Sequence, residues 1–151
     1  MLSIVWGAKW AVARWVIERI PGMTLETDDF EALGVVRDGE LVAGVVYNHF
    51  TGHDICMHVA AEPGKIWAKP KILYALFSYP FNQLKCRRVT GFVASQNAHT
   101  LPFDKKLGFV EEGRLRDATP EGDMIVIGMR RSECRWLGEM NGKERQYNAA
   151  D

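Results

Sequence analysis

The sequence predicts one α/β domain in which helices flank a mixed, mostly antiparallel sheet. Three features lead to this prediction. A helical pattern opens the chain, valine-rich segments separated by turn residues follow it, and a second helical segment lies between two further strands. A helix that connects two strands in this way normally makes them parallel neighbours, so we expect one parallel pair inside the sheet.

The first helix is predicted from apolar residues that recur at alternating steps of four and three. These residues are Trp6, Trp10, Ala13, Ile17 and Ile20. At this spacing they share one side of a helix, which ends at Pro21-Gly22 and is expected to pack on the sheet. An alternative is that two exposed tryptophans form a stripe that binds a partner.

Three antiparallel strands are predicted after this helix. Residues 33–36 and 41–47 are mostly aliphatic, and Asp38-Gly39 between them is typical of a two-residue hairpin turn. Residues 51–54 have the composition of a second turn, and residues 55–61 are predicted to form the third strand.

The next segment provides the expected parallel crossover. A helix is predicted from about Pro70, and Pro80 should kink it or end it early because proline cannot donate the helical hydrogen bond. Residues 88–94 follow as a strand, which we expect to lie parallel to residues 55–61.

A short helix and two strands complete the predicted domain. Asn97 is a suitable N-cap for the helix, and Gly108 supplies the left-handed residue at its end. Strands are predicted near residues 109–115 and 124–129, on either side of a turn at residues 120–123.

Length and charge restrict the possible classes of protein. Residues 1–137 fit one domain, and residues 138–151 are polar enough to form a tail. The 19 basic and 19 acidic residues cancel, so no overall field favours nucleic acid or an anionic membrane. Cys56, Cys86 and Cys134 have no close spacing, which favours a reducing, cytoplasmic location over a disulfide framework.

Residues 97–116 carry the strongest functional signal and read NAHTLPFDKKLGFVEEGRLR. The asparagine at the start and the Leu-Gly-Phe ending resemble the closing motif of the GNAT family of N-acetyltransferases. The continuation at residues 111–116 is most similar to the branch that contains the ribosomal-protein N-acetyltransferases. Residues 79–81 and 133–137 resemble segments of small acetyltransferases found in phage and prophage genomes.

The resemblance extends over nearly the entire chain and implies the GNAT fold, in which two central parallel strands splay apart. It also implies acetyl-coenzyme A as co-substrate, with transfer of the acetyl group to a primary amine of a protein or small molecule by direct attack. A homodimer is left open, and neither nucleic acid nor membrane is expected as a partner.

Three lysines crowd the start of the second predicted helix. Lys65, Lys69 and Lys71 lie where the helix dipole is positive, which is unfavourable by roughly 0.3 to 1 kcal/mol for each charge. An anion bound among them would reverse this effect, and the diphosphate of coenzyme A suits the arrangement. The alternative is that the long side chains extend into solvent.

The loop before this helix departs from the family pattern, Gln/Arg-x-x-Gly-x-Gly/Ala. The matching segment is residues 65–70, where Ala68 and Pro70 replace the glycines. Pro70 has no amide hydrogen, but the amides of Lys69, Lys71 and Ile72 remain available to an anion. We therefore expect a phosphate loop that depends more on lysine charge.

The resemblance assigns further cofactor contacts. The pantetheine arm would enter the gap between the diverging strands, where the backbone of Val59, Ala60 and Ala61 would hold the arm and polarise the thioester carbonyl. Asn97 would orient the cofactor loop, and Phe103 is included among the cofactor-binding residues.

Candidates for proton transfer are less well defined. Many family members place a tyrosine four residues before the glycine of the Leu-Gly-Phe ending, where this chain has Asp104. An ionised aspartate cannot donate a proton unless its pKa is greatly raised. His58 and Glu62 are the predicted catalytic residues, with Asp54 as a further possible base, because all three lie on or beside the strand next to the expected acetyl position.

Other interpretations stay open at this point. A binding or assembly module with the same fold but no turnover is favoured by Ala68, Pro70 and Asp104. His49, His53, Cys56 and His58 are potential zinc ligands, although their spacing matches no standard site, and we predict no metal. Arg114, Arg116 and Asp117 would either recognise a polar acceptor or form a solvated strand face.

Overall fold

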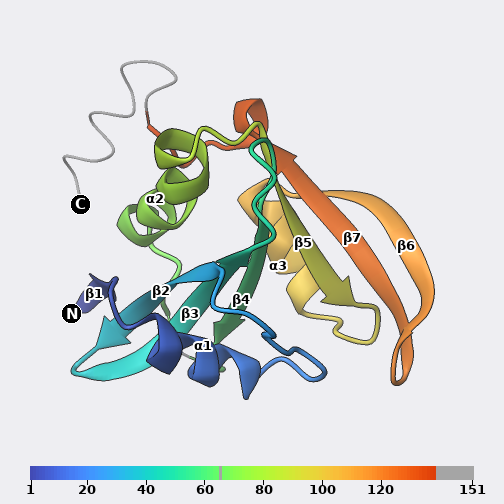
Figure 1. Ribbon diagram of the computed structural model, residues 1–151, viewed down its shortest axis with the longest axis horizontal. Helices are drawn as coiled ribbons and strands as arrows, with labels where there is room; N and C mark the ends of the chain where they lie inside the picture. The colour runs from blue at the N-terminus through green and yellow to red at the C-terminus, as the bar shows by residue number, and fades with distance from the viewer. Residues whose placement is uncertain (65, 139–151) are drawn as a thin grey trace.

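A seven-stranded sheet forms the centre of the computed structural model, which describes residues 1–64 and 66–138 (Figure 1). The strand order is β1-β2-β3-β4-β5-β7-β6, and every neighbouring pair is antiparallel except β4 and β5. The strands are β1 (Leu2–Val5), β2 (Phe30–Arg37), β3 (Glu40–Asn48), β4 (Cys56–Ala61), β5 (Arg88–Ala94), β6 (Val110–Thr119) and β7 (Gly122–Arg130). The predicted mixed sheet with one parallel pair is confirmed.

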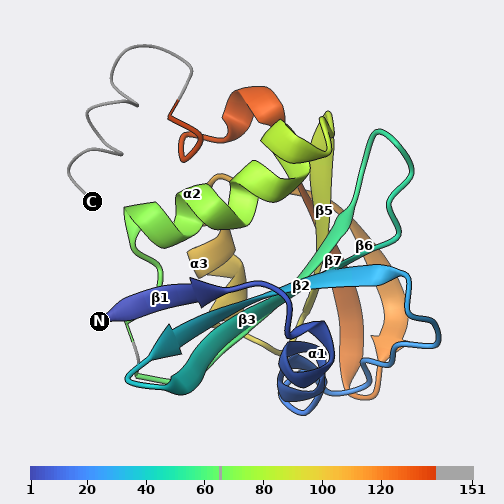
Figure 2. The same cartoon turned by 60° about the vertical axis from the view of Figure 1, so that its left-hand side comes forward.

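Helices cover both faces of the sheet (Figure 2). Helix α1 (Lys9–Ile17) packs on β2, β3 and β4 from one side, while α2 (Pro70–Ser78) and α3 (Thr100–Leu107) contribute to the apolar core on the other. A 3-10 turn, η2 (Arg131–Glu133), follows the last strand. Within the described residues, no helix is both long and apolar enough to cross a membrane.

The N-terminal segment differs from the prediction. Residues 2–5 form the edge strand β1, and the helix begins at Lys9 rather than near Trp6. Trp6 lies outside the helix and stacks on Tyr47, with ring centroids 6.2 Å apart. An edge strand of four residues gives little periodic signal, which explains why the sequence pattern extended the helix over this region.

The predicted buried side of α1 is also wrong in part. Val12, Ala13 and Val16 are buried against the sheet, whereas Trp10 is 57% exposed. Its ring meets Phe30 edge-on at a centroid distance of 5.0 Å. Nearly every position of this helix is apolar, so several stripes fit the spacing, and packing against the sheet selects one of them.

The predicted hairpin and crossover are confirmed. Asp38 and Gly39 have φ angles of 51° and 84°, as expected for a tight turn between β2 and β3. After α2 the chain widens into a π-helical turn, η1 (Tyr79–Gln83), which contains Pro80 at its start. The missing amide of proline accounts for this change of winding.

The third helix begins later than predicted. Its N-cap position is His99, and the Oδ1 atom of Asn97 accepts a hydrogen bond from the Thr100 amide at 3.4 Å. Asn97 thus stabilises the first turn from two residues before the cap. Gly108 has a φ of 121° and ends the helix as predicted.

β4 and β5 are paired at one position, near the start of each strand. Cys56 lies opposite Thr90, and the Thr90 amide donates to the carbonyl of Ile55 at 3.0 Å. The Thr90 side chain is only 8% exposed, and its hydroxyl lies 2.9 Å from both carboxylate oxygens of Asp54. Arg88 contacts the same hydroxyl through Nε at 3.2 Å. A partly buried polar network therefore connects the two strands where they meet.

We predict that Thr90→Val destabilises the protein, since valine keeps the shape of threonine but leaves the Asp54 carboxylate without its hydroxyl donor. The expected loss is about 1 to 3 kcal/mol in the free energy of unfolding, measured in urea. Thr119→Val is the matched control, because the hydroxyl of Thr119 bonds Gln96 at an exposed position of β6. Equal effects of the two substitutions would contradict a special role for the network.

Candidate active site

The two parallel strands diverge beyond Thr90 and leave part of the β4 backbone without a strand partner. β4 pairs with β3 along its whole length, with Val59 opposite Val45 and the Glu62 amide bonded to the Val42 carbonyl at 2.8 Å. Because hydrogen bonding alternates along a strand, the amides and carbonyls of Val59 and Ala61 face away from β3, towards β5. No strand pairs with them there among the described residues.

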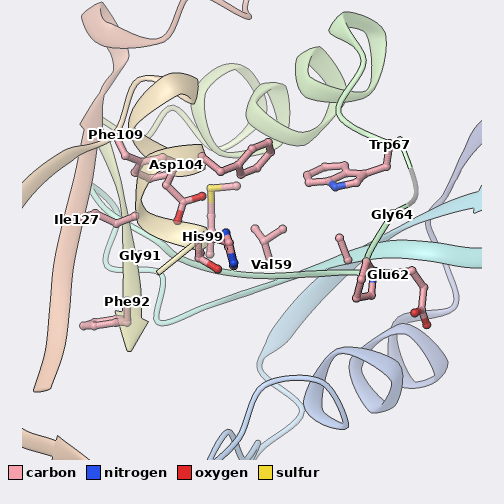
Figure 3. Close-up of a pocket in the computed structure, with 15 residues that line it drawn as sticks. Val59, Glu62, Gly64, Trp67, Gly91, Phe92, His99, Asp104, Phe109 and Ile127 are labelled. Carbon is pink, nitrogen blue, oxygen red and sulfur yellow. The ribbon is translucent and has the colours of Figure 1, made fainter. Parts of the chain in front are cut away.

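A cavity of about 460 Å³ opens at this gap (Figure 3). Its walls come from β4, β5, β7, α3 and the loop before α2, and 15 residues line it. Most are apolar, including Met57, Trp67, Phe103, Phe109 and Ile127. A slot with an apolar lining and exposed backbone groups along one side suits an elongated ligand that carries amides.

Asp104 is an ionisable residue of α3 that points into this cavity (Figure 3). Burial raises the pKa of its carboxyl from 3.8 to about 7. The described residues provide no hydrogen bond or ion pair to its side chain. The condition under which an aspartate can donate a proton near neutral pH is therefore met at this position.

His58 occupies the opposite face of β4 from the cavity. Met57, Val59 and Ala61 line the slot, so side-chain alternation directs His58 and Ala60 towards the face covered by α1. Nε2 of His58 lies 2.9 Å from Oδ1 of Asn48. Burial, with a smaller effect from His49, lowers the pKa of His58 to about 4, so the ring is neutral at physiological pH.

Glu62 lies at the end of β4 and lines the edge of the cavity, but its carboxylate is engaged elsewhere. Oε1 of Glu62 lies 2.6 Å from Nη2 of Arg19, whose guanidinium stacks on Trp15 at 3.7 Å from the ring centroid. Figure 3 shows the Glu62 side chain directed away from the middle of the slot. The ion pair connects the end of β4 to the segment after α1. Asp54, the further candidate base, belongs to the strand-joining network described above.

The predicted phosphate-binding residues surround the start of α2. Lys69 is the N-cap, Pro70 is the first helical residue, and the side chains of Lys69 and Lys71 are exposed without partners among the described residues. The Ile72 side chain is buried, so only its backbone can face a ligand. Ala68 packs against the core. Lys65 lies outside the described residues.

Two aromatic residues border the cavity near α2. Trp67 is buried, and its ring lies 6.0 Å from that of Phe103, between centroids. Asn97 is outside the lining, and its side chain accepts a hydrogen bond from the first turn of α3. Phe109, which belongs to the Leu-Gly-Phe ending, lines the cavity, and so do Trp67 and Gly91, which were not predicted as site residues. Gly91 interrupts a strand of larger residues, and such an interruption signals close approach of another group.

The other polar residues predicted as site candidates lie outside the cavity lining. Arg114 pairs with Asp123 at 3.0 Å on an exposed part of the sheet, and the Asp117 amide donates to the same carboxylate. His49, His53, Cys56 and His58 do not gather into one cluster, and the described residues include no group of three or more such side chains arranged to hold a metal ion.

The arrangement of strands and helices is shared with known N-acetyltransferases. Spermidine/spermine N-acetyltransferase SpeG from Vibrio cholerae superposes with a TM-score of 0.72 and 15% sequence identity over 93% of this chain and 97% of that protein. The ribosomal-protein-S18-alanine N-acetyltransferase from Escherichia coli gives a TM-score of 0.62 and 15% identity over 86% and 94% of the two chains.

These similarities show that the chain has the fold of the GNAT N-acetyltransferases, as the resemblance of residues 97–116 implied. At the level of sequence, no protein-family model and no curated protein matches the chain.

We predict that Asp104→Asn stabilises the protein at alkaline pH. The unfolded carboxyl loses its proton near pH 3.8, while the folded one keeps it up to about pH 7, so the free energy of unfolding falls as the pH rises between these values. With allowance for partial exposure, the loss is about 1 to 2 kcal/mol, and the neutral amide of asparagine avoids it.

The measurement is a series of thermal melts from about pH 4 to pH 8. The midpoints of wild type and Asp104→Asn should coincide at the acidic end and differ by several degrees at the alkaline end. Asp28→Asn, at an exposed position, is the control. A constant difference between the two proteins at every pH would show that the pKa of Asp104 is not raised.

Proposed function

We propose that this protein is an N-acetyltransferase that uses acetyl-coenzyme A and acetylates a primary amine. The observation that supports this most directly is the gap between β4 and β5, where the backbone of Val59 and Ala61 is free beside an apolar cavity. The pantetheine arm contains two amides, which can pair with these groups as a short additional strand. The shared fold supports the same function.

The charged end of the cofactor is assigned to the start of α2. Lys69 and Lys71 supply two positive charges, and the helix dipole adds to them. Lys65 and the backbone amides of Ala68 and Ile72 complete the proposed contacts. This placement directs the other end of the cofactor along β4, past Ala61 and Val59, towards the point where the strands meet.

The amine is proposed to approach from the other face of the sheet. His58 and Phe92 lie there, with ring centroids 6.5 Å apart, beside the gap. Neutral His58 can accept a hydrogen bond from the amine and orient it, although its low pKa makes it a weak base. We favour His58 over Glu62 for this role because Glu62 is paired with Arg19. Ala60 contributes to the apolar packing beneath this face.

Asp104 is the proposed proton donor to the departing thiolate. It lies on the cofactor side of the sheet and occupies the position of the family tyrosine. A donor with a pKa of about 7 is protonated in a large fraction of molecules at neutral pH. Phe103 and Phe109 line the same cavity and contribute to its apolar character.

A binding module without turnover is the second candidate function. It is favoured by the aromatic rings of Trp67 and Phe103, which come from the loop before α2 and from α3 and lie 6.0 Å apart at the cavity. It is also favoured by Ala68 and Pro70, which replace the two glycines of the family's phosphate loop. Release of free thiol on addition of amines distinguishes the two functions. For the acetyltransferase we further propose a relation to phage-encoded members of the family, a homodimer and a cytoplasmic location.

We predict that Lys69→Glu combined with Lys71→Glu weakens acetyl-coenzyme A binding roughly fivefold to tenfold, because two attractive charges become repulsive at an exposed site. Calorimetric titration measures the affinity. Arg14→Glu combined with Lys106→Glu changes the net charge equally at exposed positions outside the cavity lining and should leave the affinity within about twofold. Equal losses in both double variants would reject the phosphate assignment.

We predict that Asp104→Ala lowers kcat at least about a hundredfold, at the low end of the usual effect of a general acid. Thiol release is followed with a set of peptide N-termini, lysines and polyamines. Asp104→Tyr should retain more activity than Asp104→Ala, since tyrosine can also donate a proton. The wild-type kcat should decline above about pH 7, where Asp104 loses its proton. Unchanged turnover in Asp104→Ala would exclude this role.

A further inference from the structure

A second cavity lies beyond the other end of α2. It has a volume of about 690 Å³ and is lined by residues from the end of η1, the segment before β5, the end of β7 and η2. The first cavity, by contrast, borders the loop that precedes α2. Four of the seven lining residues carry a positive charge, and none is acidic: Phe81, Lys85, Cys86, Arg87, Arg130, Arg131 and Ser132. We refer to these seven residues as the basic cavity.

Backbone contacts bring the charged residues together from distant parts of the chain. The Arg131 amide donates to the carbonyl of Arg87 at 3.1 Å, which joins the end of β7 to the start of β5. The Cys86 amide donates to the Pro80 carbonyl at 2.9 Å. Lys85, which directly precedes Cys86, has a φ of 61°, a conformation that lysine rarely adopts. The fold thus keeps these residues close together, although the backbone of Lys85 is in an unfavourable conformation.

The cations of the basic cavity differ in how they are held. The guanidinium of Arg131 donates to the Phe81 carbonyl and to Oδ1 of Asn82, which fixes its orientation. Arg130 lies 3.5 Å from the carboxylate of Glu133. Lys85 and Arg87 have no side-chain partner among the described residues. The basic cavity therefore combines an oriented guanidinium with two unpartnered cations.

We propose that the basic cavity binds a small, multiply charged oxyanion of the phosphate class. Placing Lys85 and Arg87 together beside two arginines is unfavourable by itself, and an anion placed among these cations replaces repulsion with attraction. The planar fork of arginine matches the oxygens of a phosphate group and bonds two of them at once. A group with two phosphates can span the fixed Arg131 and the unpartnered pair, whereas a single charge would meet only part of the set.

This site is separate from the proposed cofactor site. The two cavities have no lining residue in common, and they border opposite ends of α2. An anion in the basic cavity is therefore a second ligand, and its binding does not depend on the proposed acetyl transfer.

Titration calorimetry of the full chain with sodium pyrophosphate tests the proposal. Lys85→Glu combined with Arg87→Glu should weaken binding by about tenfold or more, because two charged contacts are lost and replaced by repulsion. Arg14→Glu combined with Lys106→Glu provides the same change of net charge elsewhere and should leave the affinity within about twofold. Acetyl-coenzyme A affinity should be equal in the first double variant and in wild type.

Citrate is the second probe, and it tests whether the basic cavity prefers phosphate groups or carboxylate groups. Pyrophosphate should bind more tightly than citrate, and tighter citrate binding would overturn the assignment to phosphate. No saturable pyrophosphate binding by wild type, or equal losses in both double variants, would overturn the site itself. If charge reversal prevents folding, Lys85→Gln combined with Arg87→Gln provides the same comparison, with a smaller loss expected.

Discussion

The candidate active site depends on the single point at which β4 and β5 are joined. Cys56 and Thr90 form the one parallel pair between the two strands, and beyond it the strands separate while each remains paired on its other side. Unpaired backbone groups next to an apolar cavity are costly unless water or a ligand bonds them. The unpaired backbone groups of β4 at the centre of this sheet therefore need water or a ligand as their hydrogen-bond partner. The Asp54, Thr90 and Arg88 network sets where the opening begins.

Much of the architecture could be predicted because its signals are local. The turn at Asp38-Gly39, the strand at residues 88–94 and the helix end at Gly108 each follow from the conformational preference of a few residues, and the structure confirms them. The start of the chain could not be predicted in the same way. β1 is stabilised by pairing with β2 rather than by its own four residues, so its existence depends on a partner more than 20 positions away.

The site was predicted less completely than the fold, for a related reason. Periodicity places residues on a face, but it does not show which residues from separate elements meet. Trp67 and Gly91, which were not predicted, reach the same cavity from a loop and a strand. The properties of Asp104 and His58 likewise arise from burial, which moves the pKa of one carboxyl up to about 7 and of one imidazole down to about 4. Nothing in the local sequence encodes these environments.

Asp104, at the position where many GNAT enzymes have a tyrosine, connects the proposed chemistry to stability. A tyrosine is neutral at physiological pH without help from its surroundings, whereas an aspartate is neutral there only if the protein withholds water and cations from it. The apolar walls that raise the pKa of Asp104 also form the slot. The residues that keep the carboxyl protonated, as a proton donor must be, therefore also make its ionised form unfavourable. A cation placed near Asp104 would stabilise the folded protein at high pH, but it would also lower the pKa and remove the proton. The absence of such a partner among the described residues is therefore what a proton donor at this position requires.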